Sequence, residues 1–114
     1  MILIIGGACQ GKGELALKLA GGDKERVLLN VHCRIEEELR MGKSREEIQE
    51  TILEAAFGRK DMVLTADEVG CGIIPMDASL RECRETTGRI LCVVAGKAKE
   101  VYRVTAGIAQ KIKG

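Results

Sequence analysis

Four short apolar runs recur along the chain, at residues 1–5, 27–31, 62–65 and 101–104. An apolar run of this length without polar alternation predicts a strand that is buried on both faces, which is typical of a parallel sheet. Stretches with helical spacing lie between these runs, at residues 14–20, 35–41, 44–57 and from Asp77 towards Ala95. Because strands that alternate with helices predict right-handed crossovers, the expected fold is α/β, a small parallel sheet flanked by helices.

The stretch at 44–57 carries the clearest helix signals. Ser44 and Glu47 match a capping box, in which the hydroxyl accepts a hydrogen bond from a free backbone N–H and the glutamate reaches back. One apolar stripe follows at helical spacing, formed by Ile48, Ile52, Leu53, Ala56 and Phe57. Near the end of the chain, the fourth strand is expected to be followed by a turn at Gly107 and a basic tail.

Composition narrows the class of protein. The chain has 114 residues, which suits a single domain spanning residues 1–114. A net charge of +1 and only two aromatic residues argue against a nucleic-acid partner or binding to a charged membrane surface. No apolar stretch has the length of a membrane span, and five cysteines without a C-x-x-C pair give poor support for a zinc site. We therefore expect a cytoplasmic protein with free thiols and no structural metal.

A glycine-rich segment at residues 6–13 separates the first apolar run from the first helical stretch. It fits the pattern G-x-x-x-x-G-K, placed between a strand and a helix as a phosphate-binding loop requires. Backbone N–H groups would converge on a phosphate at the positive end of the helix, and Lys12 would neutralise the phosphate oxygens. The expected nucleotide-binding residues are Gly6, Gly7, Ala8, Cys9, Gln10, Gly11, Lys12 and Gly13. The alternative is a glycine-rich turn that binds nothing.

Two positions weaken a magnesium site beside this loop. Gly13 stands where the pattern usually has Ser or Thr, so the hydroxyl that normally ligates Mg²⁺ is missing. The neighbouring strand ends in Asn30, a neutral residue that attracts Mg²⁺ far less than a carboxylate does. Asn30 is better explained as a strand-end polar residue that bonds to a turn. Weak retention of Mg²⁺ is therefore expected.

Four segments of the chain resemble the motifs of a known family. Residues 67–75 read D-E-V-G-C-G-I-I-P, and residues 81–89 follow with the spacing R-x-x-R-x-x-x-G-R. Residues 100–113 read E-V-Y-R-V-T-A-G-I-A-Q-K-I-K, and residues 2–8 read I-L-I-I-G-G-A. These segments resemble N-E-V-G-x-G-I-V-P, R-x-F-R-D-x-x-G-R, E-V-x-x-V-x-x-G-I-x-x-x-I-K and I-L-V-T-G-G-A of the bifunctional adenosylcobinamide kinase / adenosylcobinamide-phosphate guanylyltransferase family.

The resemblance implies a fold of the P-loop NTPase type and a role in cobalamin biosynthesis. Enzymes of this family phosphorylate the aminopropanol hydroxyl of adenosylcobinamide with a nucleoside triphosphate. They then transfer GMP from GTP onto that phosphate through a guanylylated histidine. The implied ligands are ATP or GTP and adenosylcobinamide, and the implied assembly is a cytoplasmic homo-oligomer, typically a trimer.

This chain departs from the family pattern at the groups that would carry both reactions. The long segment between the first helix and the second strand, which holds the guanylylated histidine, is absent. The single histidine, His32, lies after that strand and does not correspond to it, so the guanylyltransferase step is expected to be lost. Gly13 and Asn30 fall at the family's serine and acidic positions, and Leu91-Cys92 falls where the family has Asn-Gln.

The retained groups give the remaining candidates. Lys12 and Glu68 are the expected catalytic residues, with Glu68 as a metal-linked or general-base carboxylate at the end of a strand. Glu68 is equally well explained as a loop residue that accepts backbone N–H bonds from its glycine-rich surroundings. Arg81 and Arg89 lie two turns apart on one side of the expected helix and form the preferred substrate-binding pair. The more common alternative for these arginines is a solvated helix face with neighbouring glutamates.

Three functions remain open on the sequence. The first is a minimal adenosylcobinamide kinase without guanylyl transfer. The second is a non-catalytic nucleotide- or corrinoid-binding homologue that acts as an oligomeric or regulatory partner, and the third is a fold without a ligand. The missing serine and acid favour the second function over the first, and the retention of Lys12 and Glu68 favours either over the third.

Overall fold

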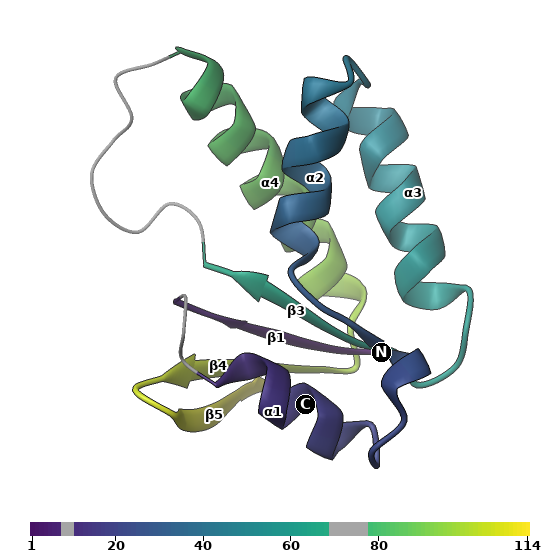
Figure 1. Cartoon of the computed structure of the whole chain (residues 1–114), viewed down its shortest axis with the longest axis vertical. Coiled ribbons are helices and arrows are strands. Elements are labelled where there is room, and N and C mark those ends of the chain that lie inside the picture. The colour runs from purple at the N-terminus through teal and green to yellow at the C-terminus, as the bar shows by residue number, and fades with distance from the viewer. Residues whose placement is uncertain (8–10, 69–77) are drawn as a thin grey trace.

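The computed structural model describes residues 1–7, 11–68 and 78–114. Its elements alternate between strands and helices along most of the chain (Figure 1). In chain order they are β1 (Ile2–Gly6), α1 (Lys12–Leu19), the 3₁₀ turn η1 (Lys24–Arg26), β2 (Val27–Leu28), α2 (Val31–Arg40), α3 (Arg45–Phe57), β3 (Val63–Asp67), α4 (Ala78–Lys97), β4 (Glu100–Thr105) and β5 (Ile108–Lys113).

The five strands found among the described residues form one sheet in the order β2-β3-β1-β4-β5. β1 pairs in parallel with both β3 and β4, and β2 pairs in parallel with β3. Only β5, at the edge of the sheet, runs antiparallel to its neighbour. The α/β fold with a small parallel sheet that the sequence predicts is therefore confirmed, with one antiparallel strand added.

Helices cover both faces of this sheet (Figure 1). α1 packs on one face, while α2, α3 and α4 form a layer on the other. Successive residues of a strand point to opposite faces, so in β1 the buried Leu3 contacts the layer of three helices and the buried Ile4 contacts α1. The first apolar run is therefore buried on both sides, as its pattern predicts.

The parallel arrangement brings the carboxyl ends of the three central strands to the same edge of the sheet. In the register of the ladder, Gly6 at the end of β1 lies opposite Asp67 of β3 on one side and Val104 of β4 on the other. Ligands of open α/β sheets bind outside this edge, because the loops that leave it can converge on one point. The fold thus places Gly6, where the glycine-rich segment begins, beside Asp67 and Glu68.

The second strand is shorter than its apolar run. β2 covers only Val27 and Leu28, because Asn30 takes the left-handed conformation at φ 55° and turns the chain. The backbone N–H of Asn30 donates to Thr65 Oγ1 at 2.9 Å, and α2 begins at the next residue, Val31. The strand expected over 27–31 is therefore present but ends at Leu28, and the expected helix start at 35 is wrong. Val31 is fully buried as a core residue of the helix, which explains why it extends the apolar run.

The expected basic tail is also wrong, because residues 108–113 form strand β5. A two-residue turn at Ala106 (φ 50°) and Gly107 (φ 77°) joins it to β4, and tight hairpin turns require such positive φ angles. Every residue of β5 is exposed, so the strand shows none of the hydrophobic alternation that would have revealed it. Lys111 pairs with Glu100 of β4 at 2.8 Å, and this hydrogen bond lowers the pKa of Glu100.

The helical predictions for 44–57 and for the last helix hold with small changes. Ser44 Oγ accepts a hydrogen bond from the backbone N–H of Glu47 at 3.2 Å, which confirms the cap. Phe57, the last residue of the stripe, is 40% exposed at the end of α3. α4 continues through Gly88 without a break, and its expected cap, Asp77, lies outside the described residues. Within the described ranges, no helix is long and apolar enough to cross a membrane.

Candidate phosphate-binding site

The turn between β1 and α1 has the backbone features of the predicted phosphate loop at both of its described ends. A Cβ atom on Gly6 would lie 2.5 Å from the carbonyl oxygen of Val104, so only glycine fits against β4 here. Gly11 takes the left-handed conformation at φ 85° and immediately precedes α1. The predicted loop residues Ala8, Cys9 and Gln10 lie outside the described residues.

Lys12, the first residue of α1, is the buried cation of this site. It is 6% exposed, and its ammonium group donates to the carbonyl oxygen of Gly7 at 2.5 Å. The same ammonium lies 2.9 Å from Oδ1 of Asp67, at the end of β3. A buried lysine needs such partners, because an uncompensated charge away from water is costly. The predicted Lys12 is therefore held at the head of α1, beside the edge of the sheet.

Asp67 is held in turn by His32, in the first turn of α2. The backbone N–H of Asp67 donates to Nδ1 of His32 at 2.9 Å, so Nδ1 acts as an acceptor and carries no proton. The proton of the neutral ring is then on Nε2, which lies 3.3 Å from Oδ2 of Asp67 and 3.3 Å from Sγ of Cys33. Both oxygens of the Asp67 carboxylate thus face a positively polarised group.

Glu68, the expected catalytic carboxylate, is paired with an arginine of β4. Arg103 donates to it through Nε at 3.2 Å and through NH2 at 2.8 Å and 3.0 Å. The backbone N–H of Glu68 also donates to the carbonyl oxygen of Gly6 at 2.7 Å, which ties the end of β3 to the start of the glycine-rich turn. The described structure therefore places Glu68 beside the site, with its charge neutralised by a forked ion pair.

The two positions where the sequence lacks magnesium ligands lie close together in the fold. Gly13 is the second residue of α1, and a Cβ atom added to it would meet only Leu29 Cδ2, at an ordinary 3.8 Å. Its lack of a side chain is therefore not a packing requirement. Asn30 is exposed and has no side-chain bond that caps α2, although its backbone N–H binds Thr65 as described above. The backbone N–H of Asn30 thus binds a strand residue, and a bond from the Asn30 side chain to a turn stays a prediction.

The two arginines of the expected substrate-binding pair lie on α4. Arg89 is exposed and pairs with Glu85 of the same helix at 2.7 Å, which is the solvated-face arrangement weighed above. Arg81 is exposed in the first turns of α4. Substrate binding by Arg81 and Arg89 stays a prediction.

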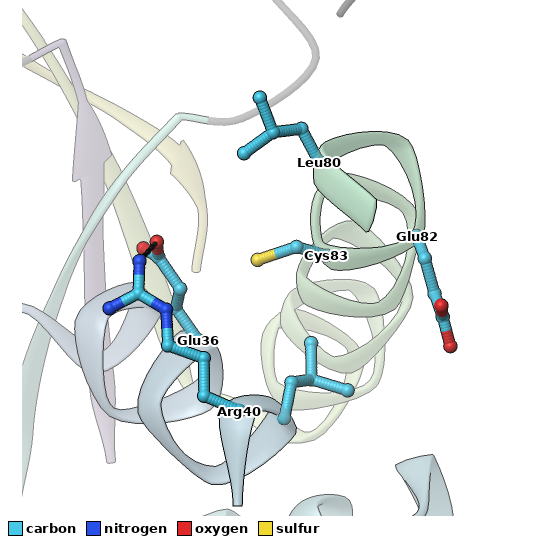
Figure 2. A pocket seen from close by; sticks show the side chains of 6 residues that line it. Glu36, Arg40, Leu80, Glu82 and Cys83 are labelled. Carbon is cyan, nitrogen blue, oxygen red and sulfur yellow. Dashed lines mark hydrogen bonds and ion pairs between the residues drawn. The ribbon is translucent and has the colours of Figure 1, made fainter. Parts of the chain in front are cut away.

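A cavity of about 270 Å³ opens between α2 and α4, one helical turn beyond His32 (Figure 2). Its described lining consists of Glu36, Leu39, Arg40, Leu80, Glu82 and Cys83. Glu36 and Arg40 form an ion pair at 2.6 Å on one wall, and the thiol of Cys83 points towards them from α4. Burial, followed by the nearby charge of Glu36, raises the pKa of Cys83 above its usual value. The cavity therefore combines leucine side chains with one thiol and a paired charge.

The fold and the similarity to known proteins together assign the chain to a protein family. The mostly parallel sheet with helices on both faces is the α/β fold of the P-loop type, as expected from the sequence. The model of the family "Cobinamide kinase / cobinamide phosphate guanyltransferase" matches residues 27–112, and the chain belongs to this family. Because the match begins at residue 27, it does not include the glycine-rich turn, and the phosphate loop stays a prediction from the sequence motif.

Two curated relatives are similar to part of the chain. The bifunctional adenosylcobalamin biosynthesis protein CobU of Escherichia coli (strain K12) is 39% identical over 67 residues, which cover 59% of this chain and 37% of that protein. The protein of the same name from Salmonella typhimurium (strain LT2) is 43% identical over 70 residues, which cover 60% of this chain and 38% of that protein. The matched region thus spans less than two fifths of either relative.

Sequence reasoning missed two members of the site. Asp67 appeared only as the start of a loop, although it stands where the resembling family motif has asparagine, and this difference was the available signal. Arg103 gave a weaker signal, as the single charged residue inside the apolar run at 101–104. Both residues join the site through the pairing of parallel strands, which no local pattern specifies.

Proposed function

We propose that this chain is a cobinamide kinase-like nucleotide-binding protein of cobalamin biosynthesis. In this proposal it binds ATP or GTP at the turn between β1 and α1 and transfers the terminal phosphoryl group to adenosylcobinamide. The observation that carries the proposal is the position of Lys12, whose buried ammonium lies at the head of α1. A phosphate there would meet the positive end of the helix, the backbone N–H groups of its first turn and one fixed cation.

In this proposal the residues position the phosphates of the nucleotide and stabilise their negative charge. A transferring phosphoryl group spreads negative charge over its oxygens, and Lys12 would stabilise that charge. Magnesium, where bound, supplies further neutralisation of the phosphates. Of the two carboxylates at the end of β3, Asp67 is close enough to Lys12 to act on the same phosphates, since its Oδ1 lies 2.9 Å from the ammonium.

We further propose that guanylyl transfer is absent from this chain. His32 is its single histidine, and both ring nitrogens already face Asp67, through the backbone N–H at 2.9 Å and through Oδ2 at 3.3 Å. A histidine nucleophile needs a ring nitrogen with a free lone pair. Nδ1 uses its lone pair for the Asp67 N–H, and Nε2 carries the proton. His32 therefore serves to hold Asp67.

The corrinoid acceptor would not fit inside the cavity between α2 and α4. The cavity between α2 and α4, at about 270 Å³, falls below the roughly 300–1,000 Å³ typical of pockets that enclose a drug-sized ligand. It could therefore receive a side arm of a large macrocycle but not the ring. A homo-oligomer in the cytoplasm is the setting that we propose for this reaction, following the family resemblance.

A second candidate function has one specific observation in its favour. Gly13 provides no hydroxyl beside the proposed phosphate position, although a Cβ atom there would meet only Leu29 Cδ2, at 3.8 Å. A protein that binds nucleotide or corrinoid without turnover, as an oligomeric or regulatory partner, would not need this hydroxyl as a ligand of Mg²⁺. The two candidates differ in whether Mg²⁺ strengthens nucleotide binding.

Isothermal titration of ATP and of GTP, each with and without Mg²⁺, tests both candidates. Tight binding that depends on Mg²⁺, followed by formation of adenosylcobinamide phosphate in a direct assay, supports the kinase. Binding that is independent of Mg²⁺, without product, supports the binding partner. Lys12→Ala is expected to abolish the signal, whereas Lys18→Ala, which removes the same charge from an exposed site in the last turn of α1, should leave it unchanged. No heat with either nucleotide would refute both.

A further inference from the structure

The four charged side chains at the edge of the sheet form two separate ion pairs. Asp67 is paired with Lys12 at 2.9 Å, and Glu68 is paired with Arg103 through contacts of 2.8–3.2 Å. Lys12 is the cation that a phosphate would engage at the head of α1, whereas Arg103 belongs to β4 and holds Glu68 in a fork. A nucleotide would therefore disturb the first pair and leave the second intact.

Phosphate binding changes the charge balance around Asp67. Once the ammonium of Lys12 turns to the phosphate oxygens, the Asp67 carboxylate loses its partner while a polyanion arrives next to it. Like charges at this range repel strongly, because the site is partly buried and poorly screened. A bound nucleotide is thus compatible with an ionised Asp67 only if another positive charge enters the site.

His32 is already engaged with Asp67, because its Nδ1 accepts the backbone N–H of Asp67 at 2.9 Å. A divalent cation would supply the positive charge without disturbing this bond. Mg²⁺ in nucleotide sites is commonly held by one or two carboxylates together with substrate phosphates and waters, so a single carboxylate at this edge fits the ion.

We infer that Asp67 is the residue that retains a divalent cation beside the bound nucleotide, in place of the ligands missing at Gly13 and Asn30. This inference rests on the proposed function, since it requires that a nucleotide binds at Lys12. It assigns different roles to the two adjacent carboxylates, with Asp67 as the cation-holding residue and Glu68 as half of a structural ion pair. It also replaces the expectation that Mg²⁺ is weakly retained, because Asp67 would hold the ion once a nucleotide is bound.

The test compares ATP affinity with and without Mg²⁺ in the wild-type chain, Asp67→Asn and Glu68→Gln, measured by titration calorimetry. In the wild type and in Glu68→Gln, Mg²⁺ should strengthen ATP binding by roughly tenfold or more, the scale of one charge-assisted contact. In Asp67→Asn this enhancement should fall below about threefold. Metal-free ATP should bind this variant at least as tightly as the wild type, because the carboxylate no longer competes for Lys12.

Several outcomes would overturn the inference while leaving nucleotide binding intact. These are an undiminished Mg²⁺ effect in Asp67→Asn, loss of the effect in Glu68→Gln alone, and a wild type that binds ATP equally well with and without Mg²⁺. Titration in two buffers of different ionisation enthalpy tests a further contrary outcome. Uptake of a proton in place of Mg²⁺ would show that protonation neutralises the site, and this would overturn the inference.

A wild type that binds no ATP refutes the proposed function as well. Thermal melting confirms that each variant is folded, and Asp67→Ala replaces Asp67→Asn if the latter does not fold.

Discussion

The ion pair between Lys12 and Asp67 should be measurable as a coupling energy in the absence of any ligand. At 2.9 Å and an effective dielectric constant of about 20, two unit charges attract by about 6 kcal/mol. Most of this attraction is offset by desolvation of the two groups, so the net value should be close to that of a hydrogen bond between charged partners, about 1.5–3 kcal/mol. Because the Asp67 side chain is 31% exposed, we expect the lower part of this range, about 1.5–2 kcal/mol.

A double-mutant cycle on urea unfolding measures this coupling. The variants are Lys12→Met, Asp67→Asn and the combination, and a coupling of this size corresponds to roughly 1 M in the unfolding midpoint at a slope of about 2 kcal/mol/M. The pair of Arg40 and Glu36 is a matched control, since its atoms are even closer, at 2.6 Å, but its side chains are 74% and 38% exposed. That pair should couple by only about 0.3–0.5 kcal/mol. Equal coupling in the two pairs, or less than about 0.5 kcal/mol between Lys12 and Asp67, would refute the reasoning that burial determines the strength of this contact.

Three further predictions concern single residues. Gly6→Ala should lower the unfolding free energy by about 1–3 kcal/mol in urea titrations, because its Cβ would overlap the carbonyl oxygen of Val104, and an unchanged midpoint would contradict this. Gly13→Ser should fold normally and strengthen ATP binding only when Mg²⁺ is present, and calorimetry that shows equal gains without the metal would count against it. Alkylation of Cys83 by iodoacetamide, followed by mass spectrometry, should become fast only at a pH above the ordinary thiol pKa of about 9, because the thiolate is the reactive form. In Glu36→Gln that pH should fall without reaching the ordinary value, because burial is the larger cause of the raised pKa, whereas an unchanged profile would exclude the charge of Glu36 as a cause.

In the proposed site, the chain departs from its family's pattern and still keeps a carboxylate beside Lys12. The acid that is missing at Asn30, beyond β2, has a counterpart in Asp67 at the end of the adjacent strand β3. Asn30 also suits its own position, since asparagine tolerates the left-handed backbone that turns the chain from β2 into α2. Asn30 is neutral where the family has an acid, whereas Asp67 is acidic where the family motif has asparagine. Both residues lie at the carboxyl edge of neighbouring strands.

The sequence by itself determined the features that depend on contiguous residues. The apolar run at residues 1–5 predicted a strand buried on both faces, and β1 packs apolar side chains on both faces of the sheet. Ser44 with Glu47 indicated a helix cap that the structure confirms, and the order of glycines and Lys12 between a strand and a helix predicts a phosphate loop. Each of these signals lies within a few residues, so local geometry is enough to interpret it.

The tertiary structure decided everything that depends on which strands become neighbours. Lys12 meets Asp67 only because β1 and β3 pair in parallel with Gly6 opposite Asp67, and Glu68 meets Arg103 because β4 lies on the other side of β1. The same holds for β5, whose exposed residues carry no pattern of their own and become a strand through the hairpin with β4. The physical reason is that side-chain burial leaves a mark on the local sequence, whereas strand order and register are set by the packing of the whole chain.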